Sequence, residues 1–101
     1  MSKITHVVLV RWKDATPAET VDAIRGVSRS LAAAIPGIVT LSEGPSVSPE
    51  GLESGFEYGL VIEFVDAAAR DGYLVHPAHL PLADALGSNS ASLVVFDLDH
   101  A

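Results

Sequence analysis

The sequence predicts an α+β domain in which four antiparallel strands form one sheet and two main helices cover one of its faces. Strand segments are rich in β-branched and aromatic residues or alternate between apolar and polar, whereas helix segments repeat apolar residues every three or four positions. In chain order the segments are strand 4–12, helix 17–35, strands 38–44 and 56–64, helix 67–74 and strand 92–98. This β-α-β-β-α-β order is the ferredoxin-like pattern.

The first strand, residues 4–12, is apolar on both of its faces. Strand alternation places His6 and Val8 on one face and Val7 and Leu9 on the other. A strand of this kind is covered on both sides in a folded protein.

The first helix is bounded by clear start and stop signals. Residues 16–19, Thr-Pro-Ala-Glu, combine a capping box with a proline in the first turn, so we expect the helix to start at Pro17. Its apolar positions, Ile24 among them, recur at helical spacing and should face the sheet. Pro36 and Gly37 end the helix.

The middle of the chain is expected to form two strands joined by a loop. Residues 45–55, which are rich in Pro, Gly and Ser, form this loop. The following strand, residues 56–64, has one definite inner face. Its inward residues are Phe56, Tyr58, Leu60, Ile62 and Phe64.

The second half continues with a short helix capped by Asp66. Pro81 leaves room only for a turn and a short helix near residues 82–86. Residues 87–90, Gly-Ser-Asn-Ser, are interpreted as a turn before the last strand.

Most of the chemistry available to the chain lies in residues 72–79, Gly-Tyr-Leu-Val-His-Pro-Ala-His. Residues three apart share a helix face, which would align Tyr73, His76 and His79. Pro77 disfavours helical geometry at His76. We therefore expect one helix to end before Pro77 and a new turn to follow, with Tyr73 and His79 on either side of a common point.

The composition of the chain limits the classes of partner and chemistry that it can have. The 101 residues form one domain, 1–101, and 49 % of them are apolar. A net charge of −7 argues against nucleic acid or an anionic membrane as partner. The absence of Cys excludes disulfides and thiolate catalysis. No apolar run reaches the roughly 20 residues of a membrane span, and the start lacks the apolar core of a signal peptide, so a cytoplasmic location is expected.

The two-faced first strand also predicts a partner. Two helices cover only one face of a sheet. If the other face stayed in water, the chain would lose the roughly 25 cal/mol that each Å² of buried apolar surface contributes to stability. A second copy packed sheet to sheet is the simplest cover, so we expect a homodimer.

At several points the sequence resembles the stress-responsive dimeric α/β-barrel (Dabb) domains. The resemblance covers nearly the whole chain and implies a homodimer whose two sheets close into a barrel with the helices outside. The matching segments are residues 4–9, 35–37, 43–44, 48–51, 73–79 and 94–97.

The resemblance also implies site residues. Some members of this family are polyketide cyclases that close a ring by an aldol reaction without metal or cofactor, and their functional pair falls here on Tyr73 and His79. The early strand histidine of the family corresponds to His6. The first helix offers Ile24 and Ser28 where such a cyclase has aromatic residues. Together with Val8 and His76, the residues His6, Ile24 and Ser28 are the candidates for binding a small organic molecule.

The residues themselves allow this chemistry and several alternatives. A buried neutral His79 could accept a proton while the Tyr73 hydroxyl donates to a carbonyl oxygen, which is the minimum set for removing a proton next to a carbonyl, as in cyclisation or isomerisation. Equally, His79 could fasten the helix junction, and His76 could cap the turn. A non-catalytic ligand-binding or stress-response dimer is the alternative function, and a cofactor-free monooxygenase is a third. No cofactor is expected, and no metal, because the His76 and His79 pair lacks an evident third ligand.

Overall fold

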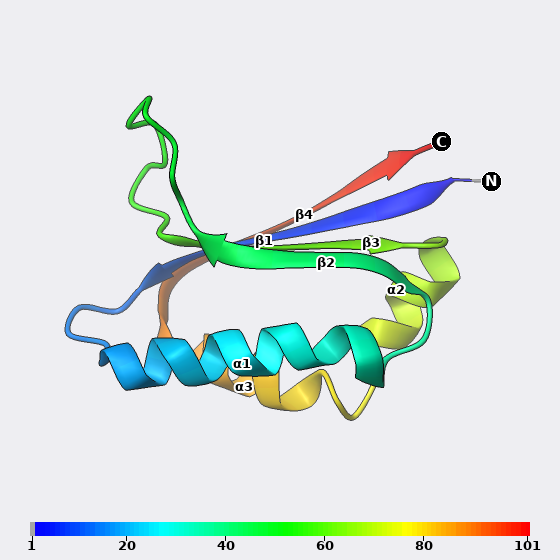
Figure 1. Cartoon of the computed structure of the whole chain (residues 1–101), viewed down its shortest axis with the longest axis horizontal. Coiled ribbons are helices and arrows are strands. Elements are labelled where there is room, and N and C mark those ends of the chain that lie inside the picture. The colour runs from blue at the N-terminus through cyan, green and yellow to red at the C-terminus, as the bar shows by residue number, and fades with distance from the viewer. Residues whose placement is uncertain (1) are drawn as a thin grey trace.

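The computed structural model describes residues 2–101 and confirms the ferredoxin-like fold. The strands form one antiparallel sheet in the order β2-β3-β1-β4, and the three helices lie together on one side of it (Figure 1). The elements are β1 (Lys3–Trp12), α1 (Ala18–Ala34), β2 (Ile38–Pro45), β3 (Tyr58–Phe64), α2 (Ala67–Leu74), α3 (Leu80–Asn89) and β4 (Ser90–His100).

The two faces of β1 differ in burial as the alternation predicts. His6 and Val8 point to the helices and are 3 % and 5 % exposed, whereas Val7 and Leu9 on the other face are only half-buried. Of the expected inward residues of the third strand, Tyr58, Leu60, Ile62 and Phe64 are buried on the helix side. Phe56 was expected with them, but it precedes β3 and lines the hollow on the open face. The core therefore lies between the sheet and the helices, and comprises Ile4, Val8, Val10, Ile24, Leu31, Ile35, Tyr58, Leu60, Ile62, Phe64, Tyr73, Leu82 and Leu86.

Helix α1 lacks the expected capping box. Pro17 occupies the N-cap with extended backbone angles, and no side chain caps the helix. The hydroxyl of Thr16 instead donates to the carbonyl of Lys13 at 2.7 Å, so it serves the preceding turn. The stop signal is confirmed, because Ile35 is the C-cap and Gly37 has a φ of +90°.

Helix α3 is longer than expected, and the turn expected at residues 87–90 is absent, since the helix runs to Asn89 and β4 begins at Ser90. Pro81 lies in the first turn of α3, where backbone N–H groups have no acceptor within the helix, so a proline there removes no hydrogen bond. The amide of Asn89 donates to the carbonyl of Ala85 within the helix. Burial of Leu82 and Leu86 against the sheet outweighs the turn preference of the last residues.

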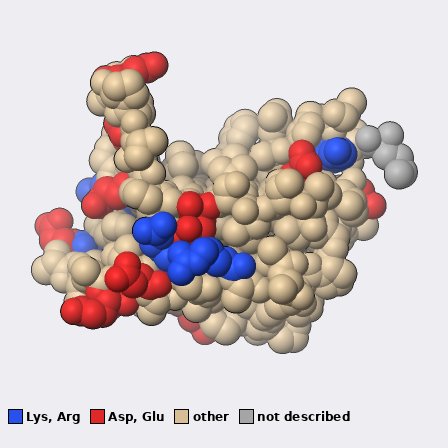
Figure 2. Space-filling view, viewed as in Figure 1, with Lys and Arg blue, Asp and Glu red and all other residues tan. Residues whose placement is uncertain are grey.

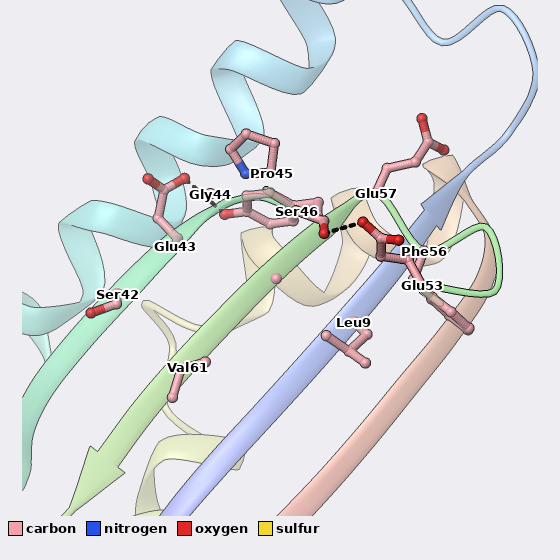
Figure 3. Close-up of a pocket in the computed structure, with 12 residues that line it drawn as sticks. Leu9, Ser42, Glu43, Gly44, Pro45, Ser46, Glu53, Phe56, Glu57 and Val61 are labelled. Carbon is pink, nitrogen blue, oxygen red and sulfur yellow. Dashed lines mark hydrogen bonds between the residues drawn. The ribbon is translucent and has the colours of Figure 1, made fainter. Parts of the chain in front are cut away.

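The sheet face away from the helices is open and largely apolar. On this face β4 exposes Val94, Phe96 and Leu98, with Phe96 at 60 % exposure, and β3 exposes Val61. The connection between β2 and β3 rises on this side (Figure 1). Next to it, a hollow of about 430 Å³ is lined by Leu9, Val61 and Gly59, among others (Figure 3).

The charged surface is mixed rather than strongly basic. On the side seen in Figure 2, basic side chains over α1 lie next to acidic ones. One such contact is that of Arg25, whose Nε donates to Oε1 of Glu43 at 2.8 Å. Within residues 2–101, none of the helices has the length and apolar character needed to cross a membrane.

Candidate active site

A cavity of about 210 Å³ lies between the helix-covered face of the sheet and helices α2 and α3. Strands β1 and β4 form its floor, and the junction of the two helices forms its wall. Apart from two histidines and a tyrosine its lining is apolar. The lining residues are His6, Val8, Tyr73, Leu74, His79, Leu82, Ala83, Leu86, Gly87, Leu93 and Val95.

The junction between α2 and α3 brings Tyr73 and His79 together. Helix α2 ends at Leu74, and the next turn is held by bonds from the His76 N–H to the Tyr73 carbonyl (3.1 Å) and from the His79 N–H to the His76 carbonyl (2.9 Å). Nδ1 of His76 accepts from the backbone N–H of Ala78 at 3.0 Å. As a result, the rings of Tyr73 and His79 lie 4.4 Å apart between centroids, as the position of Pro77 predicts.

The surroundings of His79 favour its neutral form with a free Nε2. Its Nδ1 lies 3.3 Å from the Leu74 carbonyl, which can only accept, so Nδ1 carries the proton and Nε2 has the free lone pair. Burial lowers the pKa of His79 below its usual 6.5, and the positive charge that His6 can acquire lowers it further. His79 therefore resists protonation near neutral pH.

The surroundings of Tyr73 keep its phenol protonated at the edge of the cavity. Its side chain is 1 % exposed. Its hydroxyl makes no hydrogen bond within residues 2–101, and it is not among the fully buried polar atoms that lack a partner, so the oxygen keeps access to the open space of the cavity. Burial raises the pKa of Tyr73 well above its ordinary value, so the phenol stays protonated and its proton is available to a ligand.

The second histidine of the cavity, His6, has a partner that the sequence analysis did not identify. His6 and Asp97 are directly opposite one another on β1 and β4, and Nδ1 of His6 lies 2.6 Å from Oδ1 of Asp97. Nη1 of Arg70 on α2 donates to the other oxygen of Asp97, also at 2.6 Å. Burial alone would raise the pKa of Asp97, but the bonds from His6 and Arg70 outweigh it and hold that pKa below its usual value.

Three of the expected binding residues are not part of this cavity. Ile24 and Ser28 on α1 are 2 % and 0 % exposed and belong to the core. The Ser28 hydroxyl donates to the Ile24 carbonyl at 3.0 Å and lies 3.0 Å from the hydroxyl of Tyr58. His76 borders a separate apolar groove with Pro36 and Gly37. Of the expected residues, the cavity brings together His6, Val8, Tyr73 and His79.

Arg70 and Asp97 could have been found only with the register of the sheet. The sequence contains Asp97 in an acidic carboxyl-terminal segment that resembles a solvated tail. Antiparallel pairing of β1 with β4 places it opposite His6, and the helical spacing of three residues puts Arg70 beside Tyr73. In the described part of the chain, no group of three or more His, Cys, Asp or Glu side chains could hold a metal ion.

The model of the stress responsive A/B barrel domain family, Dabb, matches residues 4–100. The chain belongs to this family. Among Dabb relatives, the olivetolic acid cyclase of Cannabis sativa is 22 % identical over 94 residues, which are 93 % of each chain.

Solved structures share the fold over almost the whole Dabb chain. A dimeric ferredoxin-like protein of unknown function from Jannaschia sp. CCS1 has a TM-score of 0.86 at 25 % identity, covering 95 % of this chain and 97 % of that one. The hydroxynitrile lyase of Passiflora edulis has a TM-score of 0.89 at 20 % identity, covering 98 % and 94 %. At 20 % identity, the similarity to the lyase shows a shared fold and no more than that.

Proposed function

We propose that this Dabb protein is a homodimer that binds a small carbonyl compound in the cavity of each subunit and removes a proton next to the carbonyl group. His79 is the base and Tyr73 the hydrogen-bond donor. The observation that supports the proposal is the hydroxyl of Tyr73, which makes no hydrogen bond within residues 2–101 and borders an apolar cavity beside the imidazole of His79.

The proposed step uses only groups of this chain. Nε2 of His79 takes the proton from the carbon next to the carbonyl, the C–H electron pair becomes part of an enolate, and negative charge develops on oxygen. The Tyr73 hydroxyl donates a hydrogen bond to that oxygen. A positioned base of this kind contributes about 10²–10⁴-fold, and a preorganised donor at the developing charge contributes about 10²–10³-fold.

The size of the cavity supports a small substrate. Its volume of about 210 Å³ is below the roughly 300–1,000 Å³ of sites for drug-sized ligands. The name of one relative, olivetolic acid cyclase, supports an enzyme acting on an organic molecule. The natural reaction would then be a cyclisation, isomerisation or lyase step that starts from the enolate.

The test is deuterium exchange in a panel of small ketones and aldehydes, followed by proton NMR in D₂O. The wild-type protein should exchange the hydrogens next to the carbonyl of at least one compound. Both His79→Ala and Tyr73→Phe should lose this exchange, whereas His100→Gln, at the far end of β4, should retain it. Exchange that persists in His79→Ala would contradict the assignment of the base.

The proposal of a homodimer is based on the open face of the sheet. Its side chains Val61, Val94, Phe96 and Leu98 are at least 38 % exposed in the single chain. Gly59 lies in the interior of β3, where glycine often marks a close approach by another chain. The Jannaschia relative is described as dimeric, which supports the same assembly here. The cytoplasmic location remains a prediction from the sequence.

Sedimentation equilibrium tests the dimer. Phe96→Glu places a charge on the open face, so the variant should become monomeric at concentrations at which the wild type is dimeric. Val75→Glu is the control, because Val75 is 77 % exposed and follows α2 on the helix side. A monomeric wild type, or a dimer that tolerates Phe96→Glu, would refute this mode of assembly.

A ligand-binding protein without catalysis is the second candidate. It is favoured by one observation, that the only side-chain hydrogen bond of His79 within residues 2–101 goes to the backbone of Leu74. In that case a ketone would bind in the cavity beside Tyr73, but the hydrogens next to the carbonyl of the ketone would not exchange with D₂O. The deuterium experiment separates the two candidates directly.

A further inference from the structure

The His6–Asp97 pair fixes which nitrogen of His6 can exchange a proton. Asp97 is held charged, so its Oδ1 only accepts, and the 2.6 Å bond requires the proton on Nδ1 of His6. In the neutral ring Nε2 is then the free nitrogen. It has no hydrogen-bond partner among residues 2–101, and the ring is part of the cavity lining.

Arg70 holds the carboxylate in this orientation. Its Nη1 donates to Oδ2 of Asp97 at 2.6 Å while its Nε donates to Asp71 at 2.8 Å. Arg70 lies one helical turn before Tyr73 on α2. A single short helix therefore fixes both the carboxylate behind His6 and the phenol in front of it.

The two imidazoles of the cavity differ in one decisive respect. The ring of His6 bonds to a carboxylate, whereas the only side-chain hydrogen bond of His79 within the described residues goes to a backbone carbonyl. Tyr73 lies between them, with its ring centroid 5.6 Å from that of His6 and 4.4 Å from that of His79. A charge on His6 further disfavours a charge on His79. Two imidazoles in one cavity, one bonded to a carboxylate and the other to a backbone carbonyl, can take the roles of acid and base.

We propose that His6 is the general acid of the site, with Asp97 and Arg70 as its positioning residues. This rests on the proposed function, in which His79 removes the proton. As the C–H bond breaks, its proton goes to Nε2 of His79, and the proton on Nε2 of a charged His6 goes to the substrate oxygen, which becomes a hydroxyl. One imidazole gains the charge that the other loses, so the net charge of the site is unchanged. The substrate class is a carbonyl compound with a hydrogen on the neighbouring carbon, and the carbonyl oxygen becomes the hydroxyl of an enol.

The first test needs no substrate. The ¹⁵N shifts of labelled histidine rings distinguish the charged ring and the two neutral tautomers. Neutral His6 should carry its proton on Nδ1, the nitrogen that faces Asp97. The titratable and charged groups around His6 are Asp97 from β4, Tyr73 and Arg70 from α2, and His79 before α3. A proton on Nε2 of neutral wild-type His6 overturns the proposal whether or not the variants fold.

The second test uses any ketone that the wild type turns over. His6→Gln and Asp97→Asn should lower kcat by about 10²-fold with little change in KM, and Asp97→Glu should restore part of the loss. Arg70→Gln should have a smaller effect in the same direction. Arg29→Gln is the charge-matched control, because Arg29 pairs with Glu43 on the other side of the helical layer.

The outcomes of the two tests are distinguishable. If no carbonyl compound is turned over, the proposed function fails and the role of His6 as an acid fails with it, whatever the tautomer. If turnover requires His79 but survives Asp97→Asn unchanged, the proposed function stands and the inference about His6 is overturned.

Discussion

Replacing Tyr73 by Phe is expected to stabilise the fold while it removes the activity. A buried hydroxyl without a partner costs about 1–3 kcal/mol relative to an apolar group of the same shape. Because the Tyr73 hydroxyl borders a cavity, which reduces this penalty, we expect a gain of about 1 kcal/mol in the free energy of unfolding. In a domain of this length that corresponds to a rise of about 4–8 °C in Tm.

The assay is urea denaturation followed by the fluorescence of Trp12, at one fixed protein concentration because dimerisation contributes to stability. Tyr58→Phe is the matched control. The hydroxyl of Tyr58 lies 3.0 Å from Oγ of Ser28 and 3.1 Å from Oε1 of Glu43, so its removal should cost about 1–2 kcal/mol.

The two tyrosines should thus respond in opposite directions. If Tyr73→Phe were destabilised as much as Tyr58→Phe, the Tyr73 hydroxyl would have a partner in the folded protein, and the reasoning that reserves it for a ligand would be refuted.

Two further outcomes follow from the pKa of His79 and the backbone at Gly37. The pKa of His79 is lower in the folded protein, so the unfolded chain binds more protons below about pH 6.5. The stability of the wild type should therefore fall as the pH drops below that value. Urea titrations at several pH values should show that His79→Gln removes this part of the fall. Gly37→Ala should destabilise by about 2 kcal/mol or more, because Gly37 has a φ of +90° and the added Cβ would lie 2.6 Å from that of Ala69. Gly26→Ala in the middle of α1 should instead stabilise by about 0.5–1 kcal/mol, so equal effects in thermal melts would contradict the steric argument.

Much of the fold is predictable because its signals are local. The alternation in β1 identifies both faces of the central strand, and Asp66 caps α2 as expected, accepting from the N–H of Ala69 at 2.8 Å. The end of α3 is different. Residues 87–89 have the composition of a turn, but they continue a helix whose earlier residues Leu82 and Leu86 are buried.

The candidate site is predictable in part for the same reason. Tyr73 and His79 meet because a proline between them ends one helix and starts a turn, which the sequence makes plain. Asp97 is 91 residues from His6, and only the pairing of β1 with β4 joins them. Ser28 was expected at the site because of its place on α1, but it lies against Tyr58, on the β3 side of the core.

The two faces of the sheet have different proposed roles. Even-numbered positions of β1, such as His6 and Val8, line the cavity of the proposed reaction, and odd-numbered positions, such as Val7 and Leu9, lie on the open face of the proposed dimer. Inserting a single amino acid near the start of β1 would shift the frame and exchange the two sets. Chemistry and quaternary structure would then be lost together, so this strand should tolerate substitution far better than any change of length.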